Sequence, residues 1–314
     1  MNKDIFKLAF IGLTFFAVGT SWAQDPVTTE VDTSWKRGGM IGLNFNQVAF
    51  SNWAAGGENS VSGIALFNYF ANYNNGTINW ENSLDLAYGL SQNGKEDARK
   101  TDDKIDIASK FGHKIGTNWY YSALLGFKSQ FTAGYNYPND SVKISDFLSP
   151  AYVTLSLGMD YKPNDNFSFY ISPIAGRLII VNDQEMADGG AFGVDPAEYD
   201  AFGVKTKSGD KLRLELGALC KIEYKKDIME NVNLNAKFEF FSNYLEDPQN
   251  VDVNASVKLT MKVNSYINAN IGAELIYDDN TTILVDSDND GVIDAAGPRT
   301  QFKELIGVGI SYKF

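Results

Sequence analysis

Apolar and polar side chains alternate with a period of two through most of the chain. Segments 78–90 and 301–314 show this most clearly, with aliphatic or aromatic residues on one parity and mostly small or polar residues on the other. Successive side chains of a β-strand point to opposite faces, so the alternation predicts strands with one apolar and one polar face. The sequence therefore predicts an all-β fold.

The pattern predicts about twelve strands. They cover residues 40–50, 60–73, 77–90, 104–115, 119–131, 151–161, a stretch from 167, and then 211–224, 232–240, 251–263, 267–277 and 301–314. Pro173 and Gly176 break the alternation of the seventh strand. Because proline cannot donate a ladder hydrogen bond, this break predicts a bulge or a kink.

The predicted connections are sorted by length. Those after every second strand have about two to six residues, whereas the others are mostly longer, and two of them (182–209 and 278–299) exceed about 20 residues. Outer-membrane barrels combine short periplasmic turns with longer outside loops. We therefore predict a closed antiparallel transmembrane β-barrel of about 12 strands, with short periplasmic turns and long extracellular loops, in the outer membrane of a Gram-negative bacterium.

The first residues have the form of a secretory signal peptide. Two lysines flank the start of an apolar run, and the small residues Ser21 and Ala23 suit cleavage after Ala23. The predicted organisation is a signal peptide at 1–23, a periplasmic lead at 24–38 and the barrel at 39–314.

The chain is acidic, with a formal net charge of −12 that becomes about −13 without the predicted signal peptide. Such a surface disfavours nucleic acid as a partner. The expected partners are outer-membrane lipid, a small solute or a surface protein, and the barrel-insertion machinery. That machinery would read Phe314, which resembles the terminal aromatic residue of outer-membrane proteins.

Charged residues of both signs fall on the polar parity and are predicted to point into the barrel. A barrel of about twelve strands encloses a space between the filled interior of eight-stranded barrels and the open channel of large porins. Interleaved opposite charges favour a packed or narrowly hydrated lumen over an open pore. The predicted inward charged residues are Glu81, Asp85, Lys104, Asp106, Lys110, Arg213, Glu215, Lys221, Glu223, Lys237, Glu239, Lys258, Lys262 and Glu274.

A lipid hydrolase is one alternative, because some outer-membrane barrels of this size hydrolyse lipids. Such an enzyme needs a nucleophile beside a base, and the single histidine, His113, would be the base. Ser109 on the same strand is too far along it to hydrogen bond His113, so a serine on a neighbouring strand would be required. We predict no catalytic residue. A second alternative is a transporter of small hydrophobic molecules, which usually has a plug and a lateral opening; residues 24–37 are too short for a plug.

One long connection carries metal-binding chemistry. Carboxylates at alternate positions, a glycine and an acid at the ninth position match the start of an EF-hand calcium loop. The twelfth position is Gly297 instead of glutamate, so the loop is closer to those of thrombospondin type 3 repeats and dockerins, with weak affinity. An acidic loop without an ion is the alternative. The predicted Ca2+ ligands are Asp286, Asp288, Asp290, the carbonyl of Val292, and Asp294.

The connection after the first strand is apolar and rich in glycine. Its residues Trp53, Gly56, Gly57 and Glu58 would fold into the barrel mouth or contact a partner, unless the flanking strands simply run long. The surrounding run from Asn46 to Ser60, NQVAFSNWAAGGENS, resembles the signature of the domain of unknown function 3078 (DUF3078) family. The resemblance extends from about Trp35 to Phe314. It implies an outer-membrane barrel of a kind found mainly in Bacteroidota, and the family has no established activity to transfer.

These features predict a non-enzymatic, porin-like barrel. It would act either as a narrow solute channel or as a scaffold for surface partners.

Overall fold

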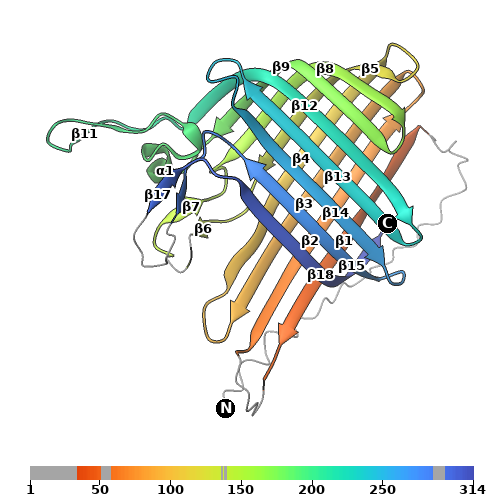
Figure 1. Cartoon of the computed structure of the whole chain (residues 1–314), viewed down its shortest axis with the longest axis horizontal. Helices are drawn as coiled ribbons and strands as arrows, with labels where there is room; N and C mark the ends of the chain where they lie inside the picture. The colour runs from red at the N-terminus through yellow and green to blue at the C-terminus, as the bar shows by residue number, and fades with distance from the viewer. Residues whose placement is uncertain (1–33, 51–57, 136, 138–139, 286–293) are drawn as a thin grey trace, which may run out of the picture. The chain divides into compact units, whose positions relative to one another are not determined.

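The computed structural model describes residues 34–50, 58–135, 137, 140–285 and 294–314. Their main element is a closed barrel of antiparallel strands in which β18 pairs with β1 (Figure 1). This confirms the predicted all-β class and the number of about twelve strands. The barrel strands are β1 (Trp35–Val48), β2 (Ser60–Asn74), β3 (Ile78–Asn93), β4 (Arg99–Lys114), β5 (Trp119–Ser129), β8 (Ala151–Asn164), β9 (Phe167–Ile180), β12 (Leu212–Met229), β13 (Val232–Asn243), β14 (Val251–Lys262), β15 (Ile267–Tyr277) and β18 (Gln301–Lys313).

The two faces of the barrel wall differ as the alternation predicts. On the outer face Leu155, Ile174 and Ile306 are exposed, whereas Asp160 and Glu215 on the inner face are buried. An apolar exterior around a polar interior is the arrangement that lets a barrel span a lipid bilayer.

Tight turns join the strands at one end of the barrel. They cover residues 75–77, 115–118, 165–166, 230–231 and 263–266. In the first turn, the side-chain oxygen of Asn74 accepts from the N–H of Gly76 at 2.8 Å, and that of Asn75 accepts from the N–H of Ile78 at 2.7 Å. Gly76 has φ of +87°, where a residue with a side chain is disfavoured, so the sequence Asn-Asn-Gly fits this turn.

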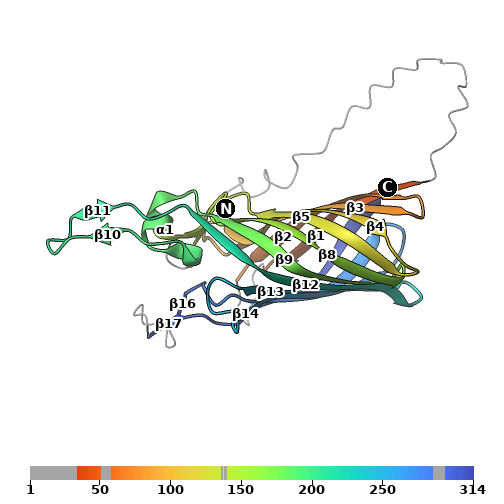
Figure 2. The same ribbon diagram turned by 90° about the horizontal axis from the view of Figure 1, so that it is seen from above.

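Longer connections join the strands at the other end. They cover residues 49–59, 94–98, 130–150, 181–211, 244–250 and 278–300, and they confirm the predicted separation of short turns from long loops. Small elements that the sequence did not predict lie in them (Figure 2). These elements are β6 (Gly134–Tyr135), β7 (Lys143–Ser145), α1 (Gln184–Asp188), η2 (Ala191–Gly193), β10 (Glu198–Tyr199), β11 (Lys205–Lys207), β16 (Ile283–Val285) and β17 (Ala295–Gly297).

Part of the connection 181–211 packs on the end of the barrel. Met186 and Ala187 of α1 join Ile179 of β9 in a buried apolar cluster. Asp183 begins α1, because its side chain accepts from the N–H of Glu185 at 3.0 Å.

The predicted irregularity of the seventh strand is a bulge in β9. The registers of β9 with both β8 and β12 shift next to Pro173. The Ser172 hydroxyl donates to the carbonyls of Leu157 and Ile174, each at 2.8 Å, and so satisfies groups that the interrupted ladder leaves.

β1 begins earlier than predicted, within the segment assigned to a periplasmic lead. The Trp35 ring contacts the Tyr73 ring at 5.3 Å and the Trp80 ring at 5.9 Å between centroids. The long strand β2 offers backbone partners down to Tyr73, so Trp35 joins the wall. The predicted signal peptide and the lead up to residue 33 lie outside the described residues. No helix in the described part of the chain is long and apolar enough to cross a membrane.

Candidate functional site: the lumen of the barrel

Ionisable side chains line the lumen in layers. The strand registers place every charged residue predicted to point inward on the inner face; Glu81, for example, lies opposite Lys110, and Glu223 lies opposite Lys237. Several of these side chains pair across the lumen with strands that are not neighbours in the wall, which shows that the passage is narrow.

The layer nearest the short turns is centred on Lys110. Its Nζ lies 2.7 Å from Asp160 and 3.4 Å from Glu81. The Ser168 hydroxyl donates to Asp160 at 2.7 Å and accepts from Lys110 at 3.1 Å. Lys162 of β8 also pairs with Glu81. Lys110 and Asp160 are buried, so this layer is a closed ion-pair network instead of an open binding site.

The middle layer contains an ion pair between opposite walls. Lys237 Nζ of β13 lies 3.6 Å from Asp85 of β3, and these two strands are on opposite sides of the barrel order. Asn68 donates to the other oxygen of Asp85 at 2.7 Å. A lysine and an aspartate are therefore enough to span the lumen at this depth.

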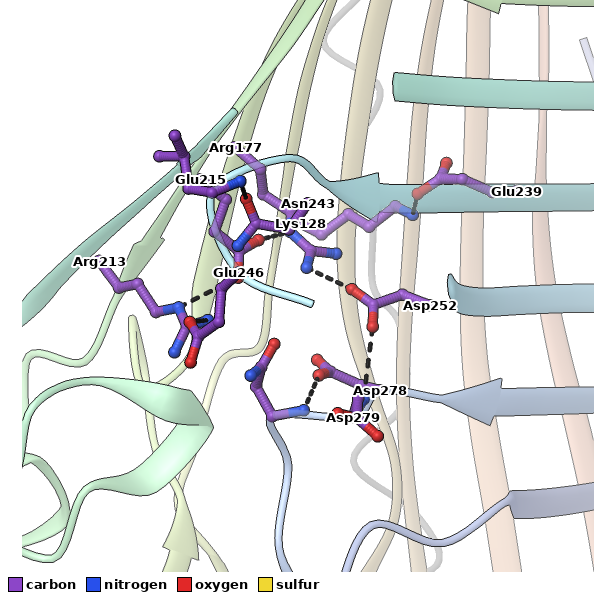
Figure 3. Close-up of polar contacts among 12 residues, drawn as sticks. Lys128, Arg177, Arg213, Glu215, Glu239, Asn243, Glu246, Asp252, Asp278 and Asp279 are labelled. Carbon is purple, nitrogen blue, oxygen red and sulfur yellow. Dashed lines mark hydrogen bonds and ion pairs between the residues drawn. The ribbon is translucent and has the colours of Figure 1, made fainter. Parts of the chain in front are cut away.

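The layer at the loop end is built around Glu215, whose carboxylate is fully buried (Figure 3). Arg177 Nε donates to it at 2.5 Å and Arg213 Nε at 3.1 Å. Arg177 also donates to Asp252, and Arg213 donates to Glu246 at 2.6 Å. Two guanidinium groups thus share one buried carboxylate and bind two further acids. The planar fork of arginine suits this arrangement.

This layer also holds the long connections over the mouth. Arg213 Nη1 donates to the carbonyl of Gly193 at 2.6 Å, which ties the connection 181–211 to the wall. The N–H of Asp279 donates to Asp252 at 3.3 Å, which ties the connection 278–300 to it as well.

The lumen is filled on one side and hydrated on the other. Beside β5, β9, β12 and β13, the buried side chains of Leu124, Tyr170, Ala175, Leu219 and Phe241 form an apolar cluster. On the other side of the lumen, the inward side chains of Lys303 and Glu274 are 40% and 43% exposed, and that of Lys237, which lies on β13 itself, is 45% exposed. Because these side chains point inward, their exposed area indicates space for water inside the barrel.

Several residues of this network were missed by the sequence reasoning. Lys128, Asp160, Asp252 and Lys303 lie on inward parities, so the alternation itself could have identified them. Arg177 could not be assigned to the inner face from the sequence, because the bulge at Pro173 reverses the alternation of β9 before the strand reaches Arg177.

The predicted loop residues are only partly described. Trp53, Gly56 and Gly57 lie outside the described residues, whereas Glu58 is exposed two residues before β2, beside Gly94.

The predicted Ca2+ loop is described only at its edge. Asp286, Asp288, Asp290 and Val292 lie outside the described residues. Asp294 is exposed, and its N–H donates to the carbonyl of Val285 at 2.8 Å. Strands β16 and β17 pair on either side of the motif and bring its two ends together. Within the described ranges, no group of three or more His, Cys, Asp or Glu side chains is placed to hold a metal.

His113 lies on the outer face near the short turns. It is exposed and lies opposite Ile78 of β3 and Tyr121 of β5. Ser109 instead donates to Asn82 at 2.8 Å and accepts from the Trp80 indole at 2.9 Å. The structure does not bring Ser109 and His113 together.

The apolar exterior, the closed ladder and the charged interior define a transmembrane β-barrel. Residues 45–135 match the family described as "Protein of unknown function (DUF3078)", which bears out the resemblance of the segment Asn46–Ser60 to this family. The comparison with curated proteins found no match to this chain.

Solved structures with a similar fold are outer-membrane barrels. An outer membrane channel from Pseudomonas putida F1 is 11% identical, with a TM-score of 0.39 over 93% of this chain and 100% of that one. The translocator domain of autotransporter NalP from Neisseria meningitidis is 11% identical, with a TM-score of 0.39 over 91% of this chain and 90% of that one. The Salmonella typhi outer membrane phospholipase, a dimer with bound calcium, is 14% identical, with a TM-score of 0.35 over 87% and 90%. Similarity at this level transfers no activity or ligand to this chain.

Proposed function

We propose that this protein lies in the outer membrane of a Gram-negative bacterium and is a narrow, passive passage for small hydrophilic solutes. The supporting observation is the pair of Lys237 and Asp85, which reaches from wall to wall while both side chains remain in contact with water. A solute would pass on the hydrated side of the lumen, beside Lys303 and Glu274, and not through the apolar cluster on the other side.

The charges of the lumen support a passage with little preference for ionic sign. Lys104 and Asp106 lie 3.6 Å apart, and Lys303 contacts both Asp102 at 2.8 Å and Glu274 at 3.8 Å. Because cationic and anionic side chains alternate along the passage, neither sign of charge dominates its field. Uncharged or zwitterionic solutes of sugar or amino-acid size are therefore the expected cargo.

Liposome swelling tests the proposal. Proteoliposomes should swell in a pentose but not in a trisaccharide, because the bridge between opposite walls limits the size of the passage. Lys237→Met should accelerate pentose entry, whereas Lys104→Met should not. Lys104 is the matched control, since it is a half-exposed lumenal lysine whose acid partner, Asp106, is on its own strand. No swelling in any solute with folded protein would reject the passage.

The passage requires no chemistry, and we propose no catalytic role for His113. A fluorogenic phospholipid should not be hydrolysed by the folded protein, with or without Ca2+. Hydrolysis that is lost in His113→Ala would contradict this and favour the lipid hydrolase.

A further inference from the structure

The closing strands β1 and β18 pair over only part of their length. β1 pairs with β2 along all of Trp35–Val48, and β18 pairs with β15 along Gln301–Ile310. In contrast, only Met40–Asn44 of β1 pair with β18, and their partners are Gly309–Lys313. This paired part lies on the side of the short turns. Beyond this ladder, the described residues Phe45–Val48 lie opposite Leu305–Val308 without pairing; we call these two segments the seam.

An unpaired seam is unfavourable in hydrocarbon. Backbone N–H and C=O groups in the bilayer must be satisfied, and open sheet edges are not found there unless water or another polar group reaches them. The side chains of Phe45, Ile306 and Val308 on the outer face of the seam are all more than half exposed, so the seam lies within the apolar exterior. A molecule that occupies it must be apolar toward the membrane and polar toward the backbone.

A buried donor without a partner lies where the ladder stops. Asn44 is the last residue of β1 that pairs with β18 and is only 6% exposed, yet its Nδ2 has no hydrogen-bond acceptor. Its side chain lies over Gly307 and Gly309 of β18, where an added Cβ would contact it. A buried amide donor without an acceptor is costly, so this position favours a ligand that brings an acceptor.

Apolar side chains continue from the seam into the lumen. Leu66 of β2 points inward beside Gly42, Ile64 lies beside Gly89, and Leu305 of β18 lies beside Gly272. Ile276 of β15 is also inward and 40% exposed. Lys303 and Glu274 lie on the same two strands, so the inner wall beside the seam is amphipathic.

We propose that the seam is a lateral opening that binds a single-chain amphiphile, such as a fatty acid, between the lumen and the membrane. The hydrocarbon tail lies between Phe45 and Ile306, and an oxygen of the head group accepts from Asn44 Nδ2. One chain fits better than two, because the seam narrows to the paired residues Asn44 and Gly309. A second copy of this protein could pair with the seam only along a full-length free strand edge. The paired part of β1 and β18 leaves no such edge. This proposal does not require that solutes pass along the barrel axis.

Photolabelling tests the ligand. Palmitic acid with a diazirine near its carboxyl group should label the inward residues Leu66 and Leu305 of the reconstituted protein. Asn44→Leu should lose this labelling, whereas Asn254→Leu, a change of an inward asparagine on β14, should retain it. Labelling of outward residues only, spread evenly over all strands, would overturn the proposal. If a variant does not fold, the labelling pattern of the wild type alone decides between the two outcomes.

Disulfide trapping tests the opening, in a background with Cys220→Ala. Gly42→Cys with Ser311→Cys, a paired position, should cross-link under mild oxidation. Asn46→Cys with Gly307→Cys, at the seam, should not. Efficient cross-linking within one chain at the second pair would show a closed seam, and cross-linking between chains would show a dimer; either result overturns the proposal.

Discussion

Gly39 and Phe314 exchange two backbone hydrogen bonds across the line where the barrel closes. The N–H of Gly39 donates to the carbonyl of Phe314 at 2.9 Å, and the N–H of Phe314 donates to the carbonyl of Gly39 at 3.1 Å. The Phe314 ring lies over Gly39, where an added Cβ would be 2.5 Å from the ring and 2.6 Å from the carbonyl oxygen of Asn68. Closure at this end therefore requires a glycine at position 39.

Gly39→Ala should weaken closure. The added methyl group forces either the terminal ring or the β2 backbone to move, which costs about 1–3 kcal/mol as overpacking does in cores. Gly42→Ala is the control, because its Cβ would meet its nearest neighbours at 3.7 Å. Urea unfolding in detergent and the mobility of unheated protein on gels measure both variants. Equal stability of the two would contradict the role of the Gly39–Phe314 contact.

Arg177→Gln should destabilise the barrel strongly. It leaves Glu215, fully buried, and Asp252 with less compensating charge, and breaking a buried pair costs about 3–5 kcal/mol. Arg177→Lys should recover only part of this, because an ammonium group cannot bind two acids with a planar fork. Lys104→Gln, which breaks a half-exposed pair, should change the unfolding free energy by less than about 1 kcal/mol. Comparable losses for Arg177→Gln and Lys104→Gln would refute the account of this layer.

The connection 181–211 should loosen in acid. Lys205 hydrogen bonds the Asp188 carboxylate, as do the N–H of Gly209 and the side chain of Gln184, and together they lower the pKa of Asp188 to about 2. A carboxyl whose pKa is lowered on folding stabilises the fold above its ordinary pKa of 3.8, and this contribution disappears as the pH falls from 3.8 to about 2.

Hydrogen exchange, corrected for its intrinsic pH dependence, checks this expectation. Peptides covering 184–209 should lose protection between pH 4 and about pH 2, while barrel strands keep theirs. Asp188→Asn should show low protection at both pH values. Protection that does not change in the wild type would argue against the Asp188 contacts.

The alternation was sufficient to predict the barrel, because every strand of the wall must turn one face to lipid and the other to water. It placed Glu81, Lys237 and Glu239 inward without knowledge of any contact. It could not predict which charges meet, because Lys237 and Asp85 are far apart in sequence and meet only when the wall closes. The bulge at Pro173 hid Arg177 for a related reason, since one extra residue reverses the parity after it.

The seam had no signal in the sequence. The alternation continues through Phe45 and through Ile306 as if both strands were paired, whereas the ladder between them ends at Asn44 and Gly309. Pairing depends on backbone direction and register, which side-chain alternation does not record.

The acidic loop should bind Ca2+ weakly. Its carboxylates alternate as in calcium loops, and the β16–β17 pair holds its ends together, but the bidentate glutamate is missing. Calorimetric titration of the wild type should give heats that disappear in the double variant Asp288→Ala, Asp290→Ala. Equal heats for the two proteins would eliminate the site.

Single-channel conductance in planar bilayers tests the central claim, a narrow hydrated lumen crossed by Lys237 and Asp85, most directly. The wild type should conduct steadily but well below the nanosiemens scale, and Lys237→Met should conduct more, with Lys104→Met unchanged. A steady nanosiemens-scale current through the wild type, or no current through either the wild type or Lys237→Met, would contradict it.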